Sequence, residues 1–275
     1  MKEPEIHAQD IPAFRILTQR IPALDGLRAI AILAVVGFHA HLPSMMGGFV
    51  GVDVFFVLSG FLITGLIVDQ ADRGHFSYTR FYAGRSLRII PPLLIVLVST
   101  LVIALFFPLL PSTFAEFGRT AYVAALFVSN FYFYQHSGYF AVSADYQPFI
   151  HTWSLSVEEQ YYLVAPIALV LLCRFARNRK ANRDHLGMLF CLATFVFSCT
   201  IMIFLSYGST HANAFAFYSS LTRIFQFATG AFLFFAFNIR SSNFAALTQQ
   251  QYLNLISAAG IGLLGYAIFF SLPAQ

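Results

Sequence analysis

Two ionisable side chains in the first apolar run have the spacing of one helix face. Arg28 and His39 are eleven residues apart in the run that begins at Leu24, and at about 100° per residue that spacing returns to within about 20° of the same face. The rise between them is about 16 Å, roughly half the hydrocarbon core of a bilayer. Ionisable groups at such depth are costly and commonly functional, so we expect an imidazole that moves a proton and a cation on the same stripe. A structural histidine and a snorkelling arginine fit the same pattern.

A second apolar run carries a carboxylate near its start. Asp53 follows the pair Gly47 and Gly48, which ends the first run, so it faces that run across a short turn. A neutral imidazole can act as a general base, and a carboxylate can orient it and stabilise its cation. We therefore predict that His39, Arg28 and Asp53 are catalytic residues.

The stretch HTWSLSVEEQYYL, which starts at His151, opens a later apolar run and contains the only tryptophan, Trp153. On a helix, His151 and Glu158 lie on one face by i, i+7 spacing, and Glu159 points about 100° away. A capped helix start with acids against the helix dipole accounts for one glutamate. It accounts less well for the histidine, the tryptophan and both glutamates together. We predict that Glu158 is catalytic, with Glu159, His151 and Trp153 as further candidates.

Three arginines stand close to or inside apolar runs. Arg85 and Arg88 are spaced i, i+3 just before the third run. Two guanidinium forks on one face can hold phosphate, although positive-inside anchoring is the better explanation from this motif alone. Arg223 lies about a turn and a half into another apolar run and needs a partner or a polar cavity. Gly230, further along that run, allows close approach of a second helix.

The composition is that of a polytopic membrane protein with an all-α fold. Of the 275 residues, 58% are hydrophobic and 10% are charged, whereas a soluble domain has about 25% charged residues. The 33 Phe and 13 Tyr suit lipid-facing surfaces and interfacial belts. No basic patch interleaved with aromatic residues is visible, so we expect no nucleic-acid partner. Cys173, Cys191 and Cys199 lie in apolar runs without a C-x-x-C pair, so neither a metal site nor a disulfide framework is predicted.

Hydropathy predicts a transmembrane helix bundle over residues 22–275, preceded by a short tail, 1–21. We expect about eight spans, one of them weak. Their predicted ranges are 24–42, 50–68, 89–109, 119–135 (the weak one), 153–173, 187–206, 217–237 and 252–272.

The distribution of Lys and Arg predicts the orientation. The tail, a polar loop at 69–88 and the cluster at 174–183 should be cytoplasmic, and the loop at 207–216, which has no Lys or Arg, should be outside. A full crossing between 110 and 150 breaks this pattern. We therefore predict that 119–135 is re-entrant, interfacial or a buried hairpin. The alternative is a full span there, with the basic cluster outside. The 110–150 stretch, with Tyr132, Tyr134, Tyr139 and Tyr146, is our candidate for acceptor binding or an interfacial aromatic belt.

Several motifs, in order, resemble those of the acyltransferase 3 family of integral membrane proteins. They are LDGLRAIAILAVVGFHAH, GGFVGVDVFFVLSGFLIT, RSLRIIPP, HTWSLSVEEQYYLVAP and FYSSLTRIFQFATGAFL. The resemblance implies an enzyme of the bacterial inner membrane that takes an acyl group, usually acetyl, from cytoplasmic acyl-CoA. It implies transfer to a hydroxyl of a carbohydrate, such as a cell-envelope or lipid-linked glycan.

The same resemblance implies roles for individual residues. His39 matches the essential histidine and Arg28 its motif partner, Arg85 and Arg88 match a pair that handles acyl-CoA, and Glu158 matches the motif glutamate. Arg223 matches an arginine usually followed three residues later by Glu, where this chain has Gln226. Acyl-CoA is then a donor substrate, and no bound cofactor is expected.

Two other interpretations stay open. A transporter or flippase for a glycan or small solute could also place His, Asp and Arg inside the membrane. The predicted spans are fewer than that family usually has, and we expect the domain to be incomplete at its C-terminus. A non-catalytic bundle is therefore the third interpretation.

Overall fold

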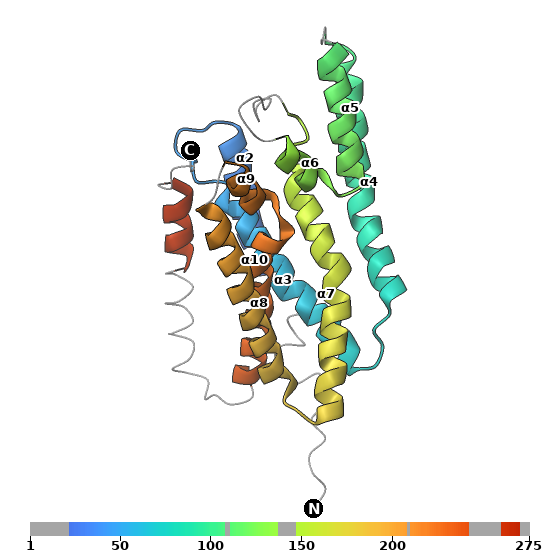
Figure 1. The fold of residues 1–275 in the computed structure, drawn as a ribbon, viewed down its shortest axis with the longest axis vertical. Helices are drawn as coiled ribbons and strands as arrows, with labels where there is room; N and C mark the ends of the chain where they lie inside the picture. The colour runs from blue at the N-terminus through green and yellow to red at the C-terminus, as the bar shows by residue number, and fades with distance from the viewer. Residues whose placement is uncertain (1–21, 108–110, 137–146, 208–209, 242–259, 270–275) are drawn as a thin grey trace, which may run out of the picture. The chain divides into compact units, whose positions relative to one another are not determined.

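The computed structural model of this chain describes residues 22–107, 111–136, 147–207, 210–241 and 260–269, which are folded mainly into α-helices (Figure 1). Within these ranges, six helices are long and apolar enough to cross a membrane. The predicted all-α membrane bundle is thereby confirmed, while the number of about eight spans stays a prediction. The helices are α2 (Pro22–His39), α3 (Val50–Asp72), α4 (Tyr78–Ala104), α5 (Pro111–Ala125), α6 (Ser129–Gln135), α7 (Thr152–Arg179), α8 (Arg183–Ser206), α9 (Thr210–Tyr218), α10 (Ser220–Ser241) and a last helix, Gly260–Phe269.

The helices form two compact units. Among the described residues, the first unit contains 22–69, 172–193, 226–241 and 260–269, and the second contains 70–107, 111–136, 147–171, 194–207 and 210–225. The first unit is therefore built around α2, α3 and most of α10. The second is built around α4 to α6, most of α7, and α9.

Glycines bring helix backbones of the first unit into contact. A Cβ on Gly60 of α3 would lie 2.1 Å from the carbonyl oxygen of Phe227, and a Cβ on Gly230 of α10 would lie 2.0 Å from that of Val57. The rings of Phe56 and Phe227 stack beside this contact, 4.7 Å between centroids. The predicted close approach of a second helix at Gly230 is confirmed, and that helix is α3.

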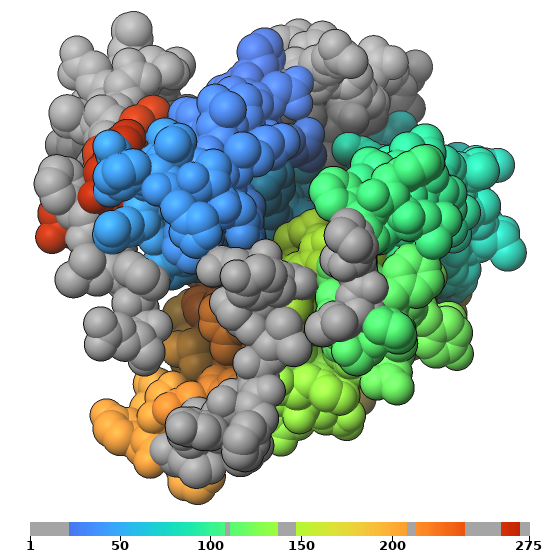
Figure 2. All heavy atoms as spheres, turned by 90° about the horizontal axis from the view of Figure 1, so that it is seen from above, coloured from blue at the N-terminus to red at the C-terminus, as the bar shows by residue number. Residues whose placement is uncertain are grey.

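The turn between α2 and α3 also depends on a small residue. A Cβ on Gly48 would lie 2.0 Å from the carbonyl oxygen of Ala34, so α2 and the start of α3 meet closely, as Figure 2 shows in blue. The N–H of the neighbouring Gly47 donates to the carbonyl oxygen of Ile268 at 3.0 Å, which ties the last described helix to this turn. The predicted span 252–272 is described only over 260–269.

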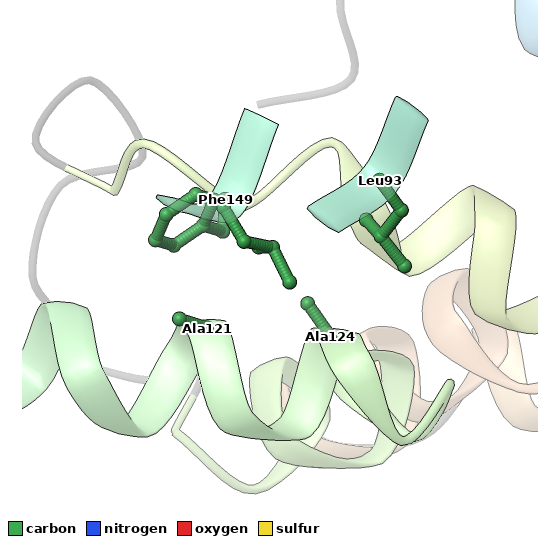
Figure 3. Packing of buried hydrophobic residues seen from close by; sticks show 5 residues of the cluster. Leu93, Ala121, Ala124 and Phe149 are labelled. Atoms are coloured by element: carbon green, nitrogen blue, oxygen red, sulfur yellow. The ribbon is translucent and has the colours of Figure 1, made fainter. Parts of the chain in front are cut away.

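The second unit has a small apolar core between α4, α5 and the residue stretch before α7. Figure 3 shows Leu93 and Phe149 directed toward Ala121 and Ala124 of α5. Phe149 is completely buried. Helix α5 packs against α4, and α6 packs against both α5 and α9. The chain therefore turns back along α4 before α7 begins.

The prediction of a polar loop at 69–88 is wrong for most of that range, because α4 already begins at Tyr78. The hydroxyl of Ser77 caps the helix by accepting a hydrogen bond from the N–H of Arg80, 3.4 Å away. Pro91 and Pro92 lie inside the helix and not in its first turn, as membrane helices tolerate. The polar composition of the first turns hid the helix from a prediction based on hydropathy.

Two further boundaries differ from the predicted ones. The run 119–135 is divided between α5 and α6, with Phe127 in the left-handed region at φ 56°. A single long helix is therefore absent from these described residues, and the re-entrant arrangement stays a prediction. Helix α7 continues past 173 to Arg179 and ends before Lys180, whose φ of 50° is typical of a helix C-terminus. In the predicted outer loop at 207–216, α9 begins at Thr210.

Candidate functional site

The predicted site residues are distributed over both units. The first unit holds His39, Arg28 and Asp53. The second unit holds Arg85, Arg88, His151, Trp153, Glu158, Glu159 and Arg223.

His39 is the last residue of α2, and its side chain is exposed. Its ring meets that of Phe38 edge to face, with 5.4 Å between centroids. Arg28, near the other end of α2, pairs with Asp25 at 3.3 Å, one turn earlier on the same helix. The sequence predicted Arg28 and His39 on one stripe but did not predict this acidic partner. An exposed imidazole at a helix end can exchange protons with a substrate.

Asp53 has a partner from a distant part of the sequence. Nε2 of Gln226 donates to its Oδ1 at 3.0 Å, and Gln226 is only 3% exposed. Oε1 of Gln226 is buried without a hydrogen-bond partner among the described residues. Gln226 thus donates a hydrogen bond to a carboxylate, which a glutamate carboxylate at this position could not do.

Arg85 and Glu158 meet the same tyrosine. The Cζ atom of Arg85 lies 4.2 Å from the centroid of the Tyr162 ring, and the Tyr162 hydroxyl donates to Oε1 of Glu158. Tyr162 is 3% exposed, whereas Arg88, one turn beyond Arg85, is exposed. The sequence did not predict that Arg85, before one apolar run, and Glu158, at the start of another, would share one side chain.

Glu159 has a different environment from its neighbour. Its Oε1 is buried and has no hydrogen-bond partner within the described parts of the chain. The charges of Glu158 and Arg85 both act on its carboxyl group. His151 directly precedes α7 and is exposed, so it does not belong to the helix whose face it was predicted to share.

The start of α7 also carries polar residues that hold helices together, and the sequence analysis did not predict them. Thr152, Ser156 and Gln160 recur every four residues along α7, a polar stripe within an apolar helix. Oγ of Ser129 lies 2.8 Å from that of Ser156 and accepts a hydrogen bond from Thr152 at 3.0 Å. Gln160 donates to the carbonyl of Phe127 at 3.1 Å, and it pairs with Asn130 at 2.9 Å. The i, i+4, i+8 polar spacing was the signal available in the sequence.

Arg223 has the partners that an arginine in an apolar run requires. Its Nε donates to the carbonyl oxygen of Phe217 at 2.9 Å. Its Cζ lies 4.7 Å from the Phe217 ring and 5.5 Å from the Trp153 ring. The ring of Tyr218 meets Trp153 edge to face at 5.6 Å. Trp153 and Arg223 thus belong to one aromatic cluster with Phe217 and Tyr218.

Two of the tyrosines proposed for acceptor binding, Tyr132 and Tyr134, contact other side chains of the protein. Tyr132 donates to Oε1 of Glu116 at 2.6 Å and stacks on His136 at 4.0 Å. Burial, together with the hydrogen bond and the charge of Glu116, raises the pKa of the Tyr132 phenol to about 12. Tyr134 meets Phe215 edge to face at 5.2 Å. The remaining two, Tyr139 and Tyr146, lie outside the described residues.

A family model described as an acyltransferase domain matches residues 21–274. The chain belongs to the acyltransferase 3 family. The chain is 31% identical, over 259 residues, to the peptidoglycan O-acetyltransferase OatA of Listeria monocytogenes, covering 93% of this chain and 40% of that protein. It is also 31% identical over 254 residues to the O-acetyltransferase OatA of Staphylococcus aureus, covering 92% and 40%. The chain thus spans about 40% of the length of these curated relatives. No solved structure matches it.

All the candidate site residues lie within the range matched by the family model, residues 21–274. The matched range includes both units, so the family match covers His39 and Arg28 as well as Arg85 and Glu158. All the motifs found in the sequence therefore lie within the range that the family model matches.

Proposed function

We propose that this chain is a membrane O-acetyltransferase domain that moves an acetyl group from acetyl-CoA to a hydroxyl of a cell-envelope carbohydrate. The observation that carries the proposal is the family match over residues 21–274, which includes both groups of candidate residues. The names of the relatives, one of them a peptidoglycan O-acetyltransferase, support a carbohydrate acceptor.

Arg85 and Arg88 are our candidates for the acyl-CoA phosphates. Both belong to α4 at i, i+3 spacing, so their guanidinium groups project from neighbouring positions of one rigid helix. Arg88 is exposed, and Arg85 is held against the ring of Tyr162. Two guanidinium groups fixed on a helix suit the bidentate recognition of phosphate oxygens.

His39 is our candidate general base. In the proposed step the acceptor hydroxyl gives its proton to the neutral imidazole, and its oxygen bonds to the thioester carbonyl carbon. The carbon–sulfur bond breaks, CoA leaves as the thiolate, and the imidazolium returns the proton to that sulfur. General-base assistance of this kind contributes roughly 10²–10⁴-fold. Asp53, in the same unit as His39 and hydrogen-bonded to Gln226, is the carboxylate that we assign to stabilising the imidazolium.

The test is transfer of label from radiolabelled acetyl-CoA to envelope glycan in membrane vesicles that contain this chain. We expect His39→Ala to abolish transfer while the protein stays folded. His41→Ala is the matched control, since His41 is also exposed but lies beyond the end of α2, and it should retain transfer. Full transfer by His39→Ala would contradict the role of His39. Glycan movement that needs no acyl-CoA would favour a transporter instead.

A further inference from the structure

We propose that Tyr162 is a positioning residue that connects the acyl-CoA-binding arginine to the motif glutamate. Its ring holds Arg85, and its hydroxyl holds Glu158. The inference rests on the proposed function, because it assigns to Tyr162 the organisation of the donor end of that same site.

The ring of Tyr162 fixes Arg85 through its face. The guanidinium carbon lies 4.2 Å from the ring centroid, within the range over which a cation is attracted to an aromatic face. Tyr162 is 3% exposed, so the ring itself has little freedom to move. All five N–H donors of an arginine lie in the plane of its guanidinium group. A cation–π contact uses no N–H donor of Arg85 for a conventional hydrogen bond to Tyr162, so the arginine can be held by the ring and still offer donors to a phosphate.

The hydroxyl of Tyr162 fixes Glu158 on the same helix. The two residues are one turn apart on α7, and the hydroxyl donates to Oε1 of the carboxylate. A hydrogen bond to the charged form of a carboxylate favours that form and orients it. One side chain thus holds both a cation and an anion, each through a different chemical group.

A neighbouring contact holds α4 at the level of this tyrosine. The hydroxyl of Tyr82 donates to the carbonyl oxygen of Leu163 at 2.9 Å. Tyr82 precedes Arg85 on α4, and Leu163 follows Tyr162 on α7. This hydrogen bond joins α4 and α7 one residue from Tyr162, and so it supports the contact between Arg85 and the Tyr162 ring.

The two functions of Tyr162 can be separated by substitution. Tyr162→Phe keeps the ring and removes the hydroxyl, whereas Tyr162→Leu removes both. We would measure the Kd for CoA on purified protein in nanodiscs, and kcat and KM for acetyl-CoA on the same samples. Tyr122→Leu is the control, since Tyr122 is 66% exposed on α5.

We expect Tyr162→Phe to lower kcat about tenfold and to change its pH profile, with the Kd for CoA within about twofold of the unmodified chain. Tyr162→Leu should raise that Kd roughly 3- to 30-fold, the size of a cation–π contact. Arg85→Ala should then weaken CoA binding by a smaller factor in the Tyr162→Leu background than in the unmodified chain, because the effects of coupled residues are not additive. Tyr122→Leu should leave Kd and kcat unchanged.

Additive effects of Arg85→Ala and Tyr162→Leu on CoA binding would overturn the inference, as would equal Kd values for Tyr162→Leu and the unmodified chain. Equal loss of CoA binding in Tyr162→Phe and Tyr162→Leu would overturn the division between ring and hydroxyl. A failure of the proposed function is distinguishable, because the unmodified chain itself would then neither bind CoA nor transfer acetyl.

Discussion

Glu159 combines a buried acceptor with a like-charged neighbour. Its Oε1 has no hydrogen-bond partner in the described part of the chain, and Glu158 adds a second negative charge. An unsatisfied buried group costs about 1–3 kcal/mol, more when it is charged. We expect Glu159→Gln, which removes the charge, to stabilise the folded protein by about 1 kcal/mol, or about 2–4 °C in Tm for a chain of this size. Acetyl transfer should fall if the carboxylate contacts substrate.

The measurement is thermal unfolding in one detergent, paired with the vesicle transfer assay. Glu116→Gln is the control, since Glu116 already accepts a hydrogen bond from Tyr132 and lies 3.9 Å from Arg119. Neutralising it should bring no gain in stability. A lower Tm for Glu159→Gln would contradict this prediction, because it would mean that the Glu159 carboxylate stabilises the folded protein.

At the residue scale, the sequence reveals charged residues in apolar runs but not the neutral residues that contact them. Asp53, Glu158 and Arg223 are conspicuous because an ionisable group in a hydrophobic stretch needs a reason. Tyr162 is not conspicuous, because tyrosine is an ordinary residue in membrane helices, and Gln226 is conspicuous only as a departure from the motif that the chain resembles. Gln226 lies 173 positions from its partner Asp53, and Arg85, which contacts the Tyr162 ring, is on a different helix. No local pattern encodes these two pairings, although Glu158 is only one turn from Tyr162.

At the element scale, the contact between α3 and α10 depends on a glycine. The Cβ of an alanine at position 230 would lie 2.0 Å from the carbonyl oxygen of Val57, so the two helices would have to separate. Overpacking of this kind costs about 1–3 kcal/mol, more than the roughly 1 kcal/mol that alanine gains over glycine in a helix. We therefore expect Gly230→Ala to lower the unfolding temperature.

Gly118→Ala is the matched control for this prediction. Gly118 lies inside α5, and nothing stands within 4 Å of a Cβ placed there. The helix-propensity gain should then dominate, and the variant should be as stable as the unmodified chain or more so. Both variants would be compared by thermal unfolding in the same detergent. Equal Tm values for the two would show that α3 and α10 can move apart without cost.

The boundaries of the elements were harder to predict than their existence. The apolar runs of α2, α3 and α8 start or end within a few residues of the predicted spans. Helix α4 starts eleven residues before its predicted span, at Tyr78 and not at 89, because a side-chain cap and not hydropathy sets its start. The division between α5 and α6 depends on the backbone of Phe127 and on Gln160 of α7, which binds the Phe127 carbonyl. A tertiary contact therefore sets that boundary.

At the scale of the whole molecule, the charge pattern predicts an orientation for the candidate spans. If the N-terminus is cytoplasmic and α5 and α6 stay on one side, as we predict, then α2, α3, α4, α7, α8 and the stretch Asn213–Ile239 cross the membrane in alternate directions. The basic end of α7, with Arg177 and Arg179 in its last turn, is then cytoplasmic, as the positive-inside rule requires. If α5 and α6 together crossed the membrane, that basic end would face outward.

Cysteine accessibility tests this topology directly. With Cys173, Cys191 and Cys199 replaced by alanine, we expect Ser112→Cys at the start of α5 and Gln135→Cys at the end of α6 to react with a membrane-impermeant maleimide in intact cells. His75→Cys and Ala181→Cys, both at exposed positions between helices, should react only after permeabilisation. Labelling of positions 112 and 135 from opposite sides would make the α5–α6 segment a full crossing. The basic cluster would then lie outside, and the orientation that we predict for α7 and the helices after it would be wrong, while α4 with Arg85 and Arg88 would keep its own orientation.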